Sequence, residues 1–173
     1  MVCHLPADRT AVAAHDKCVY SRLDSYGPSR LGGSPAHDVR TGFMMAVTIQ
    51  LSVMLENKRG ALAEICSELA KVAVNILALM VPDQAGVAPV RLVTNSTEAA
   101  RKVFDKLGIT YTEEEVLAIR VSDRPGALGR LTRKLADHNI DVKYAYGSIV
   151  KNACKEALII LAVSDVAAAK LIK

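Results

Sequence analysis

The chain repeats itself: residues 50–81 match residues 116–147 at a constant offset and without a gap. The identical pairs are Leu51 with Leu117, Gly60 with Gly126, Ala61 with Ala127, Leu62 with Leu128, Leu69 with Leu135 and Ala70 with Ala136. Such self-similarity indicates two copies of one supersecondary unit. The length of 173 residues has room for two small units and excludes a large multidomain enzyme.

Both copies have the same predicted order of elements. An alternating strand leads through a sharp turn into an amphipathic helix, and further strands follow. The expected strands are 48–55, 74–81, 88–94 and 109–115 in the first copy and 117–121, 140–150 and 156–163 in the second, and a second helix is expected over 97–107. The order βαββαβ predicts an α+β fold, with two tandem ferredoxin-like units and antiparallel sheets.

The second copy stops early. When its third strand is aligned with that of the first copy, the final Lys173 comes level with Phe104. A counterpart of the strand 109–115 is therefore missing, and we expect a second unit that is truncated at its carboxyl end. One edge of its sheet would then lack a neighbour and be open to pairing with another chain.

The first 44 residues differ from the rest. They hold three of the six prolines and three of the four histidines, and the run 26–35 is rich in turn residues. We expect a loose, largely disordered tail over residues 1–44, a first unit over 45–115 and an incomplete second unit over 116–173. Met44 and Met45 directly precede the first strand, so a further hypothesis is that translation starts there, which an intact-mass measurement of the native protein decides.

Composition limits the class of protein. With 51% hydrophobic residues and a mean hydropathy of +0.21, the chain has enough apolar surface for a packed core. No apolar run approaches the ~20 residues that cross a bilayer, and the amino terminus lacks the pattern of a secretory signal. Four cysteines without paired spacing indicate no disulfide framework. We therefore expect a soluble, cytoplasmic protein that has no membrane partner.

The two strand-to-helix turns carry the candidate chemistry. Each turn ends in a glycine, Gly60 or Gly126, that runs straight into a helix. A glycine there lets the backbone approach a ligand, and the free N–H groups of the first helical turn favour an anion. Asn57 and Asp123 stand three residues before each glycine, where a side-chain oxygen accepts a hydrogen bond from an ammonium group. Carboxylate and ammonium together describe a free amino acid.

A purely structural role is open for the same two residues. Asn and Asp most often satisfy such turns or cap the helix that follows, and a duplication preserves structural turns as well as binding sites. Repetition of the whole constellation favours binding, but it does not exclude capping by Asn57 and Asp123.

The turn segments 51–62 and 121–128, each followed by a helix and then by Val74-Asn-Ile or Ile140-Asp-Val, resemble the ACT domain, a regulatory amino-acid-binding module. The resemblance covers about residues 46–173. It is closest to small stand-alone bacterial proteins of two tandem ACT units. The chain is more distantly similar to the small regulatory subunit of acetolactate synthase.

The resemblance implies a ligand held between the first turn of one unit and the second strand of a neighbouring unit, in a homodimer whose ACT sheets lie side by side. The implied ligand-binding residues are Asn57, Gly60, Ala61, Leu62, Asn75, Ile76, Asp123, Gly126, Ala127, Leu128, Asp141 and Val142. Members of the family usually carry a glycine before the second strand, where this chain has Ala73 and Asn139.

Catalysis and metal binding find little support in the sequence. No nucleophile and base recur in both copies, so we expect no catalytic residue and no cofactor. His138 is predicted to be a solvated helix-end residue, and Cys66 a small core residue. No metal site is expected, because the cysteines and histidines of the tail match no standard zinc spacing; these are Cys3, His4, His15 and Cys18.

Nucleic-acid binding is a competitor at the level of the fold, because RNA-recognition domains share the order βαββαβ. Those domains stack bases on aromatic side chains of the third strand, and the third strands here have none. Tyr144 and Tyr146 share one face of a second strand, which is more typical of a half-buried sheet surface. We therefore expect no nucleic-acid partner.

These observations predict a non-catalytic, amino-acid-binding regulatory or sensor protein, with an enzyme as a further partner. The alternative is an interaction module that pairs through its sheets, or a regulatory subunit of an amino-acid biosynthetic enzyme, similar to the acetolactate synthase small subunit, without a ligand of its own.

Overall fold

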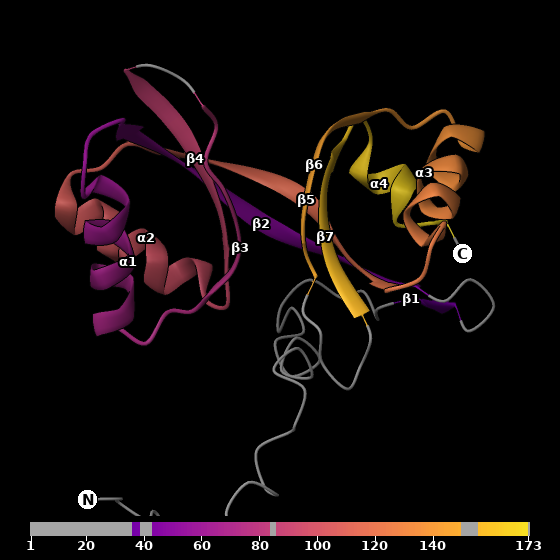
Figure 1. The fold of residues 1–173 in the computed structure, drawn as a ribbon, viewed down its shortest axis with the longest axis horizontal. Helices are drawn as coiled ribbons and strands as arrows, with labels where there is room; N and C mark the ends of the chain where they lie inside the picture. The colour runs from indigo at the N-terminus through magenta and orange to yellow at the C-terminus, as the bar shows by residue number, and fades with distance from the viewer. Residues whose placement is uncertain (1–35, 39–42, 84–85, 150–155, 173) are drawn as a thin grey trace, which may run out of the picture.

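A computed structural model describes residues 36–38, 43–83, 86–149 and 156–172. The elements in chain order are β1 (Ala36–Asp38), β2 (Phe43–Glu56), α1 (Ala61–Lys71), β3 (Ile76–Met80), β4 (Val87–Thr94), α2 (Thr97–Leu107), β5 (Tyr111–Ser122), α3 (Ala127–Asp137), β6 (Val142–Ile149), β7 (Glu156–Val163) and α4 (Val166–Ala169). The strands form one antiparallel sheet in the order β3-β4-β2-β5-β7-β6, and β1 pairs with β2 (Figure 1). The predicted α+β fold with two ferredoxin-like units is confirmed.

The core of the first unit lies between its sheet and helices α1 and α2. Leu51 and Val53 alternate along β2 and meet the apolar face of α1. Ile65 and Leu69, four residues apart on α1, are almost fully buried there, as is Phe104 of α2. The spacing of apolar residues along the first helix therefore predicted correctly which face packs on the sheet.

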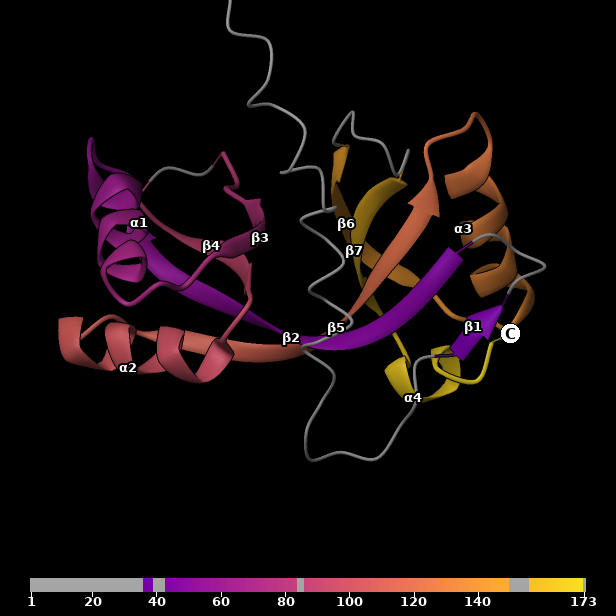
Figure 2. The same cartoon turned by 90° about the horizontal axis from the view of Figure 1, so that it is seen from below.

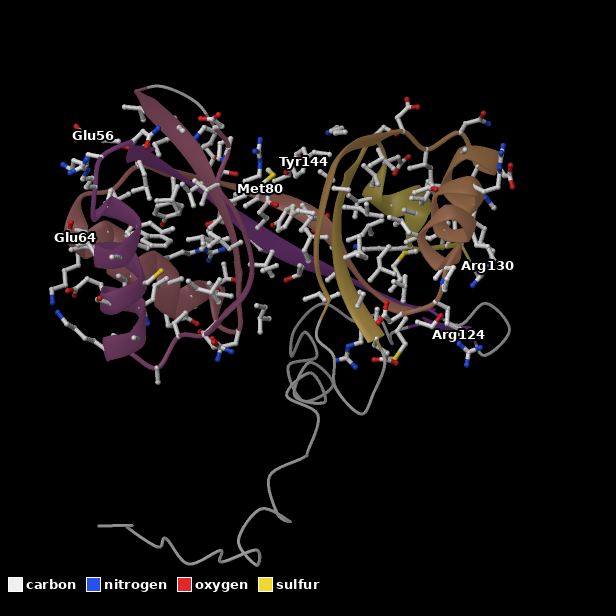
Figure 3. All side chains as sticks on the ribbon, viewed as in Figure 1. Glu56, Glu64, Met80, Arg124, Arg130 and Tyr144 are labelled. Atoms are coloured by element: carbon white, nitrogen blue, oxygen red, sulfur yellow. The ribbon has the colours of Figure 1, made fainter. Side chains whose placement is uncertain are left out.

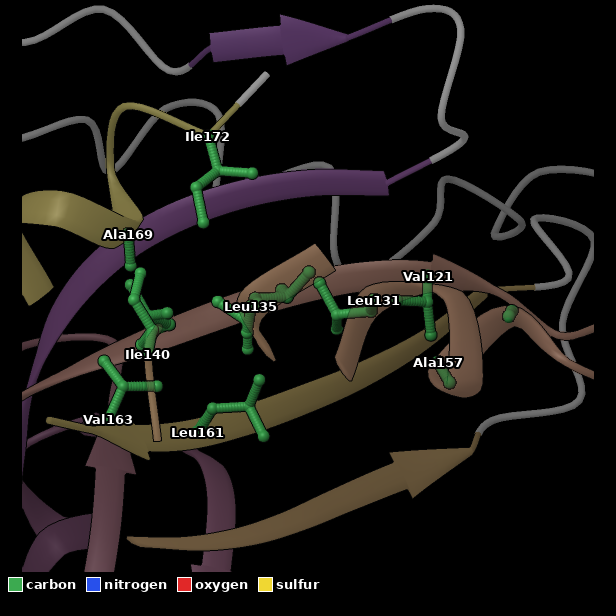
Figure 4. Close-up of a cluster of buried hydrophobic side chains, with 12 residues drawn as sticks. Val121, Leu131, Leu135, Ile140, Ala157, Leu161, Val163, Ala169 and Ile172 are labelled. Carbon is green, nitrogen blue, oxygen red and sulfur yellow. The ribbon is translucent and has the colours of Figure 1, made fainter. Parts of the chain in front are cut away.

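The core of the second unit repeats this arrangement around α3. Leu117 and Ile119 of β5 belong to the same buried cluster as Leu131 and Leu135 of α3. Figure 4 shows the two α3 leucines facing Leu161 of β7. Helix α4 closes the core with Ala169, which is fully buried. The short α4 thus provides a reduced version of the second helix of the first unit.

Strand β2 belongs to both units. Its carboxyl-terminal part, Leu51–Glu56, pairs with β4 in the first unit. Its amino-terminal part, residues 43–49, pairs with residues 115–121 of β5, in the place where the fourth strand of the second unit would lie. Met45 and Val47 pack against the second core. The expectation that one edge of the second sheet lacks a neighbour is wrong, because β2 extends past its own unit and covers that edge.

Strand β5 is shared in the same way. Its first part pairs with β2 as the fourth strand of the first unit, and residues 117–122 pair with β7 as the first strand of the second unit. The sequence pattern predicted two separate strands in this region, 109–115 and 117–121. The boundary proposed between residues 115 and 116 falls inside one continuous strand.

The helices lie on the outer sides of the molecule, and the helix-free faces of the two half-sheets turn toward each other (Figures 1 and 2). A third apolar cluster fills the space between them; it contains Ala78, Val93, Val116, Leu158, Ile160 and Ala162. We call this contact between the two units the seam. Edge strands β3 and β6, which end the sheet on either side, also contact each other.

The tail predicted over residues 1–44 lies mostly outside the described residues. Of that range, residues 36–38 form β1 and residues 43–44 begin β2. The cysteines and histidines considered for a metal site, Cys3, His4, His15 and Cys18, lie outside the described residues. In the described part of the chain, no group of three metal-ligating side chains comes together.

Candidate functional site

The two turns that the sequence singled out have the same backbone geometry. We call residues 56–63 and 122–129 the α1 corner and the α3 corner. Gly60 and Gly126 occupy the N-cap positions with φ of 89° and 82°, a left-handed conformation that favours glycine. An added Cβ on Gly60 would meet no atom within 4 Å, so backbone conformation rather than space requires glycine there.

The helices of this chain are capped in two different ways. Helices α2 and α4 begin with the side chains of Ser96 and Asp165, which accept hydrogen bonds from Ala99 N and Ala168 N at 3.4 and 2.8 Å. Helices α1 and α3 have no side-chain cap. Glycines, rather than Asn57 and Asp123, hold their N-cap positions, so capping does not explain these two polar residues.

The sequence predicted free N–H groups in the first turn of α1 and α3, and the structure shows that the first of these in each helix is already bonded. The N–H of Ala61 donates to Lys58 O at 3.3 Å, and the N–H of Ala127 donates to Arg124 O at 3.1 Å. Within the described chain, we find no acceptor for the next two amides of either helix, which are those of Leu62 and Ala63 and of Leu128 and Gly129. The sequence missed Ala63 and Gly129, although the four unpaired amides that begin every helix are the signal for them.

Charge distinguishes the two corners. In the α1 corner, Lys58 lies 2.8 Å from Glu56. Their hydrogen bond and mutual attraction lower the pKa of Glu56 and raise that of Lys58. Glu64 adds a carboxylate in the first turn of α1, and the equivalent residue of the α3 corner is Arg130.

The α3 corner has no acidic residue in the first turn of its helix. The Nη1 atom of Arg130 lies 3.4 Å from the position that a Cβ on Gly126 would occupy, so the guanidinium covers the corner. Arg124 is exposed beside it. When Glu64 and Arg130 are counted with their corners, the charges sum to zero in the α1 corner, where Arg59 adds to Lys58, and to +1 in the α3 corner, where Asp123 offsets one arginine. By this count the α3 corner is the more cationic and the better suited to a carboxylate.

The second-strand residues that the resemblance implied lie elsewhere. Asn75 and Asp141 come just before β3 and β6 and are exposed. The N–H of Asn75 donates to Oδ1 of Asn95 at 2.8 Å, and the N–H of Asp141 donates to Oγ of Ser164 at 3.0 Å. These matched bonds tie the start of each second strand to the end of the third.

The structure does not bring the corners and the second-strand residues of one chain together. Within each unit an 11-residue helix of about 16 Å separates them. The two corners also lie at opposite ends of the molecule, with Glu56 and Glu64 at one side and Arg124 and Arg130 at the other (Figure 3). A site of the implied kind is therefore not assembled from the residues of either unit alone.

Hollows in the described part of the chain include the following pair, which lies away from the corners. One, of about 310 Å³, lies between the edge strands and is lined by Ile76, Leu77, Ala78, Leu79, Tyr146 and Gly147. The other, of about 450 Å³, lies at the carboxyl end of α3 and is lined by Thr132, Ala136, Asn139, Ile140, Asp141 and Val142. Of the implied ligand residues, Ile76, Asp141 and Val142 line these hollows.

The seam holds a polar cluster that the sequence did not reveal. Gln50, which is fully buried, donates from Nε2 to the hydroxyl of Tyr144 at 2.6 Å and accepts from the hydroxyl of Tyr146 at 2.8 Å. The hydroxyl of Tyr144 also donates to Glu114. The half-buried position predicted for both tyrosines is confirmed. A single glutamine within a strand gives no signal of burial, since strand side chains alternate between faces.

Burial changes the acidity of the two tyrosines. Loss of water contact raises the pKa of Tyr146 well above its ordinary value, and it raises that of Tyr144 with help from the hydrogen bond to Glu114. Both hydroxyls therefore remain protonated donors at neutral pH.

The structure also locates His138 and Cys66, the two residues for which the sequence analysis predicted a structural rather than a catalytic role. His138 is exposed at the C-cap of α3, with Nδ1 2.8 Å from Lys134 O, so its predicted helix-end position is confirmed. Cys66 is half-buried on α1, outside the hydrophobic core clusters, so the prediction of a core residue is wrong; its thiol is free.

Two ferredoxin-like units in tandem, each with a glycine at the start of its first helix, define a class of paired α+β domains. The chain belongs to the ACT domain pair family, whose model matches residues 45–167. ACT domains are regulatory domains rather than catalytic ones, as the resemblance implied. No curated protein matches the chain.

Solved structures share this fold. Protein BT0572 from Bacteroides thetaiotaomicron is 27% identical, with a TM-score of 0.64 over 70% of this chain and 82% of that one. The regulatory subunit of aspartate kinase from Thermus thermophilus, in its ligand-free form, is 12% identical, with a TM-score of 0.50 over 68% of this chain and 85% of that one. At the latter identity the similarity shows the fold alone.

No helix in the described ranges is both long and apolar enough to cross a membrane.

Proposed function

We propose that this protein is a non-catalytic regulator that binds a free amino acid at its two corners. The observation that carries the proposal is the duplicated glycine N-cap. In both copies it leaves two helix amides without an acceptor among the described residues, while α2 and α4 are capped by side chains. Two unpaired amides at the positive end of a helix match the two oxygens of a carboxylate.

The remaining polar groups of each corner fit the rest of an amino acid. In the proposed complex the ligand carboxylate accepts hydrogen bonds from Leu128 N and Gly129 N, or from the matching amides of α1. The ligand ammonium donates to Asp123 or Asn57, which stand three residues before each glycine. Arg130 adds attraction at the α3 corner, so this corner is expected to bind first.

The proposal includes a second copy of the chain, which completes each corner with Asn75–Ile76 or Asp141–Val142. Edge strand β3 supports this partner, because it pairs on one side only and because Leu79, Val81 and Val87 at its hairpin are 40 to 52% exposed. The regulated partner in this scheme is an enzyme of amino-acid metabolism, and the expected location is the cytoplasm.

A thermal-shift screen of the twenty common amino acids tests the proposal. A ligand at a hundredfold excess over its Kd adds ~2.7 kcal/mol to the free energy of unfolding, which is a clear rise in Tm. We expect Asp123→Ala to reduce the rise more than Asn57→Ala, and the exposed residue Asp137→Ala to leave it unchanged. If no amino acid raises Tm, the protein is instead a sheet-pairing or regulatory subunit without its own ligand.

A further inference from the structure

The two copies of the repeat differ in charge just before their second strands. Asp141 stands before β6, and the equivalent residue before β3 is Asn75. Both backbones are fixed in the same way, because the two N–H groups donate to the side chains of Ser164 and Asn95. An aspartate and an asparagine have nearly the same shape, but the ionised carboxylate only accepts hydrogen bonds. The copies therefore differ at this position by one negative charge.

The carboxylate of Asp141 has no cation of its own within the described ranges. The residue is exposed, and none of the ion pairs found there includes it. Lys143, two residues further along the chain, has its Nζ atom 3.9 Å from a carboxylate oxygen of Glu114. The ring of His138 is engaged through Nδ1 with the carbonyl of its own helix. The carboxylate is therefore open to a cation from outside the chain.

Asp141 lines the hollow of about 450 Å³ at the carboxyl end of α3. The remaining lining residues are Thr132, Ala136, Asn139, Ile140 and Val142. A cavity of this size has room for a long amino-acid side chain. The carboxyl end of a helix carries a partial negative charge, so the position of the hollow favours a cation as well.

The matching surface of the first copy lacks this character. By the offset of the repeat, its residues are Cys66, Ala70, Ala73, Val74, Asn75 and Ile76. None of them carries a charge at neutral pH, since an ordinary thiol is protonated there. The same position in the two copies therefore offers a ligand two different environments.

We propose that the site completed by Asp141 selects an amino acid whose side chain carries a positive charge. In the proposed function, helix amides bind the ligand carboxylate, and Asp123 or Asn57 accepts from its α-ammonium group, so Asp141 is left for the side chain. This inference rests on the proposed function and adds the class of ligand. The site completed by Asn75 takes a neutral amino acid instead.

Titration calorimetry on the full chain tests this selectivity with two pairs of probes. Norleucine has the four-carbon side chain of lysine without its ammonium group, and citrulline has the shape of arginine without its charge. We expect lysine or arginine to bind roughly ten- to a hundredfold more tightly than its neutral analogue, the effect of one charge-assisted hydrogen bond. All titrations are made at pH 7 and at the same ionic strength.

The internal repeat supplies the variants. Asp141→Asn gives the second copy the residue of the first, and we expect it to abolish the preference for the cationic probe. Asn75→Asp makes the reverse change and is expected to raise the number of lysine or arginine sites per chain. Asp137→Asn, at an exposed position of α3 outside the lining of the hollow, removes one negative charge elsewhere and should keep the wild-type preference.

The outcomes separate this inference from the proposed function. Neutral analogues that bind the wild type as tightly as lysine and arginine do, or a preference that survives Asp141→Asn, overturn the inference and leave the proposed function intact. A preference lost equally in Asp137→Asn belongs to the general charge of α3 and overturns the role of Asp141. Absence of binding by any of the twenty amino acids rejects the proposed function, and the inference with it.

Discussion

Individual residues show where this chain departs from the usual chemistry of its fold. Ala73 and Asn139 have positive φ values of 56° and 57°, at the positions before the second strand where the resemblance led us to expect glycine. Both residues end a helix: Val74 N–H reaches back to Leu69 O, and Ile140 N–H reaches back to Leu135 O, each at 3.0 Å. The left-handed residue is thus required by the helix end itself.

Replacing Ala73 by glycine is expected to stabilise the protein by about 1 kcal/mol, because a Cβ in the left-handed conformation is strained. Asn139→Gly is expected to gain less, since asparagine tolerates this conformation. Urea unfolding measures both changes. The control is Ala70→Gly, within helix α1, which should cost roughly 1 kcal/mol; a loss of stability in Ala73→Gly would contradict the strain argument.

The tyrosines of the seam predict a pH dependence. Unfolded tyrosine loses its proton near pH 10, and folded Tyr146 keeps its proton to higher pH, because burial raises its pKa. Above about pH 10 the unfolded state therefore binds fewer protons than the folded state. The contribution of Tyr146 to the free energy of unfolding is constant below about pH 10 and falls as pH rises above it. Unfolding of wild type and Tyr146→Phe between pH 8 and 11 is the measurement. The fall should be shallower in the variant, and parallel curves would speak against a buried hydroxyl.

At the scale of elements, the main feature is that two long strands, β2 and β5, each serve both units. The first part of β2 completes the second unit, and the first part of β5 completes the first unit. The second unit therefore depends on residues 43–49, which precede the first unit's part of β2 in the sequence.

Removal of residues 1–49 is expected to destabilise the second unit, because it exposes the β5 edge and uncovers the core that Met45 and Val47 protect. A chain that starts at Met44 loses β1 and Phe43 but keeps residues 44–49, so it should unfold at a urea concentration much closer to that of the full chain. The two truncations are compared by urea unfolding and by size-exclusion chromatography. Equal midpoints for the two truncated chains would show that the second unit does not need this strand.

Much of this architecture was predictable from the sequence. Helix α2 and strand β7 have the bounds that the alternation and capping residues predicted, and both glycine corners lie where the repeat placed them. The pairing of residues 43–49 with 115–121 was not predictable, because alternation fixes which face a strand buries and not which neighbour it meets. Burial of Gln50 escaped notice for a related reason: its partners, Tyr144 and Tyr146, are 94 and 96 residues away.

At the scale of the whole molecule, we expect the two units to unfold together. Its single sheet runs through both units, and the seam joins their helix-free faces through an apolar cluster and the hydrogen bonds of Gln50. Local damage in one unit should therefore be felt in the other.

Leu135→Ala tests this cooperativity. The side chain is fully buried in the second core, and its truncation is expected to cost about 2–5 kcal/mol. Native-state hydrogen exchange should then show the slowest amides of α1 and of α3 losing the same amount of protection, although α1 lies in the other unit. A loss confined to α3 would mean that the units unfold independently. Cys66→Ser, at a half-buried site on α1, provides the matching test in the first unit: its effect on hydrogen exchange is measured in α3 as well as in α1.

The shared strands also limit how such a gene is able to change. A crossover or fusion joint between residues 115 and 116 would cut β5 in half and leave both products short of a strand, even though the sequence repeat marks that point as a natural border. Recombination would have to copy, lose or transplant the two units as a single cassette.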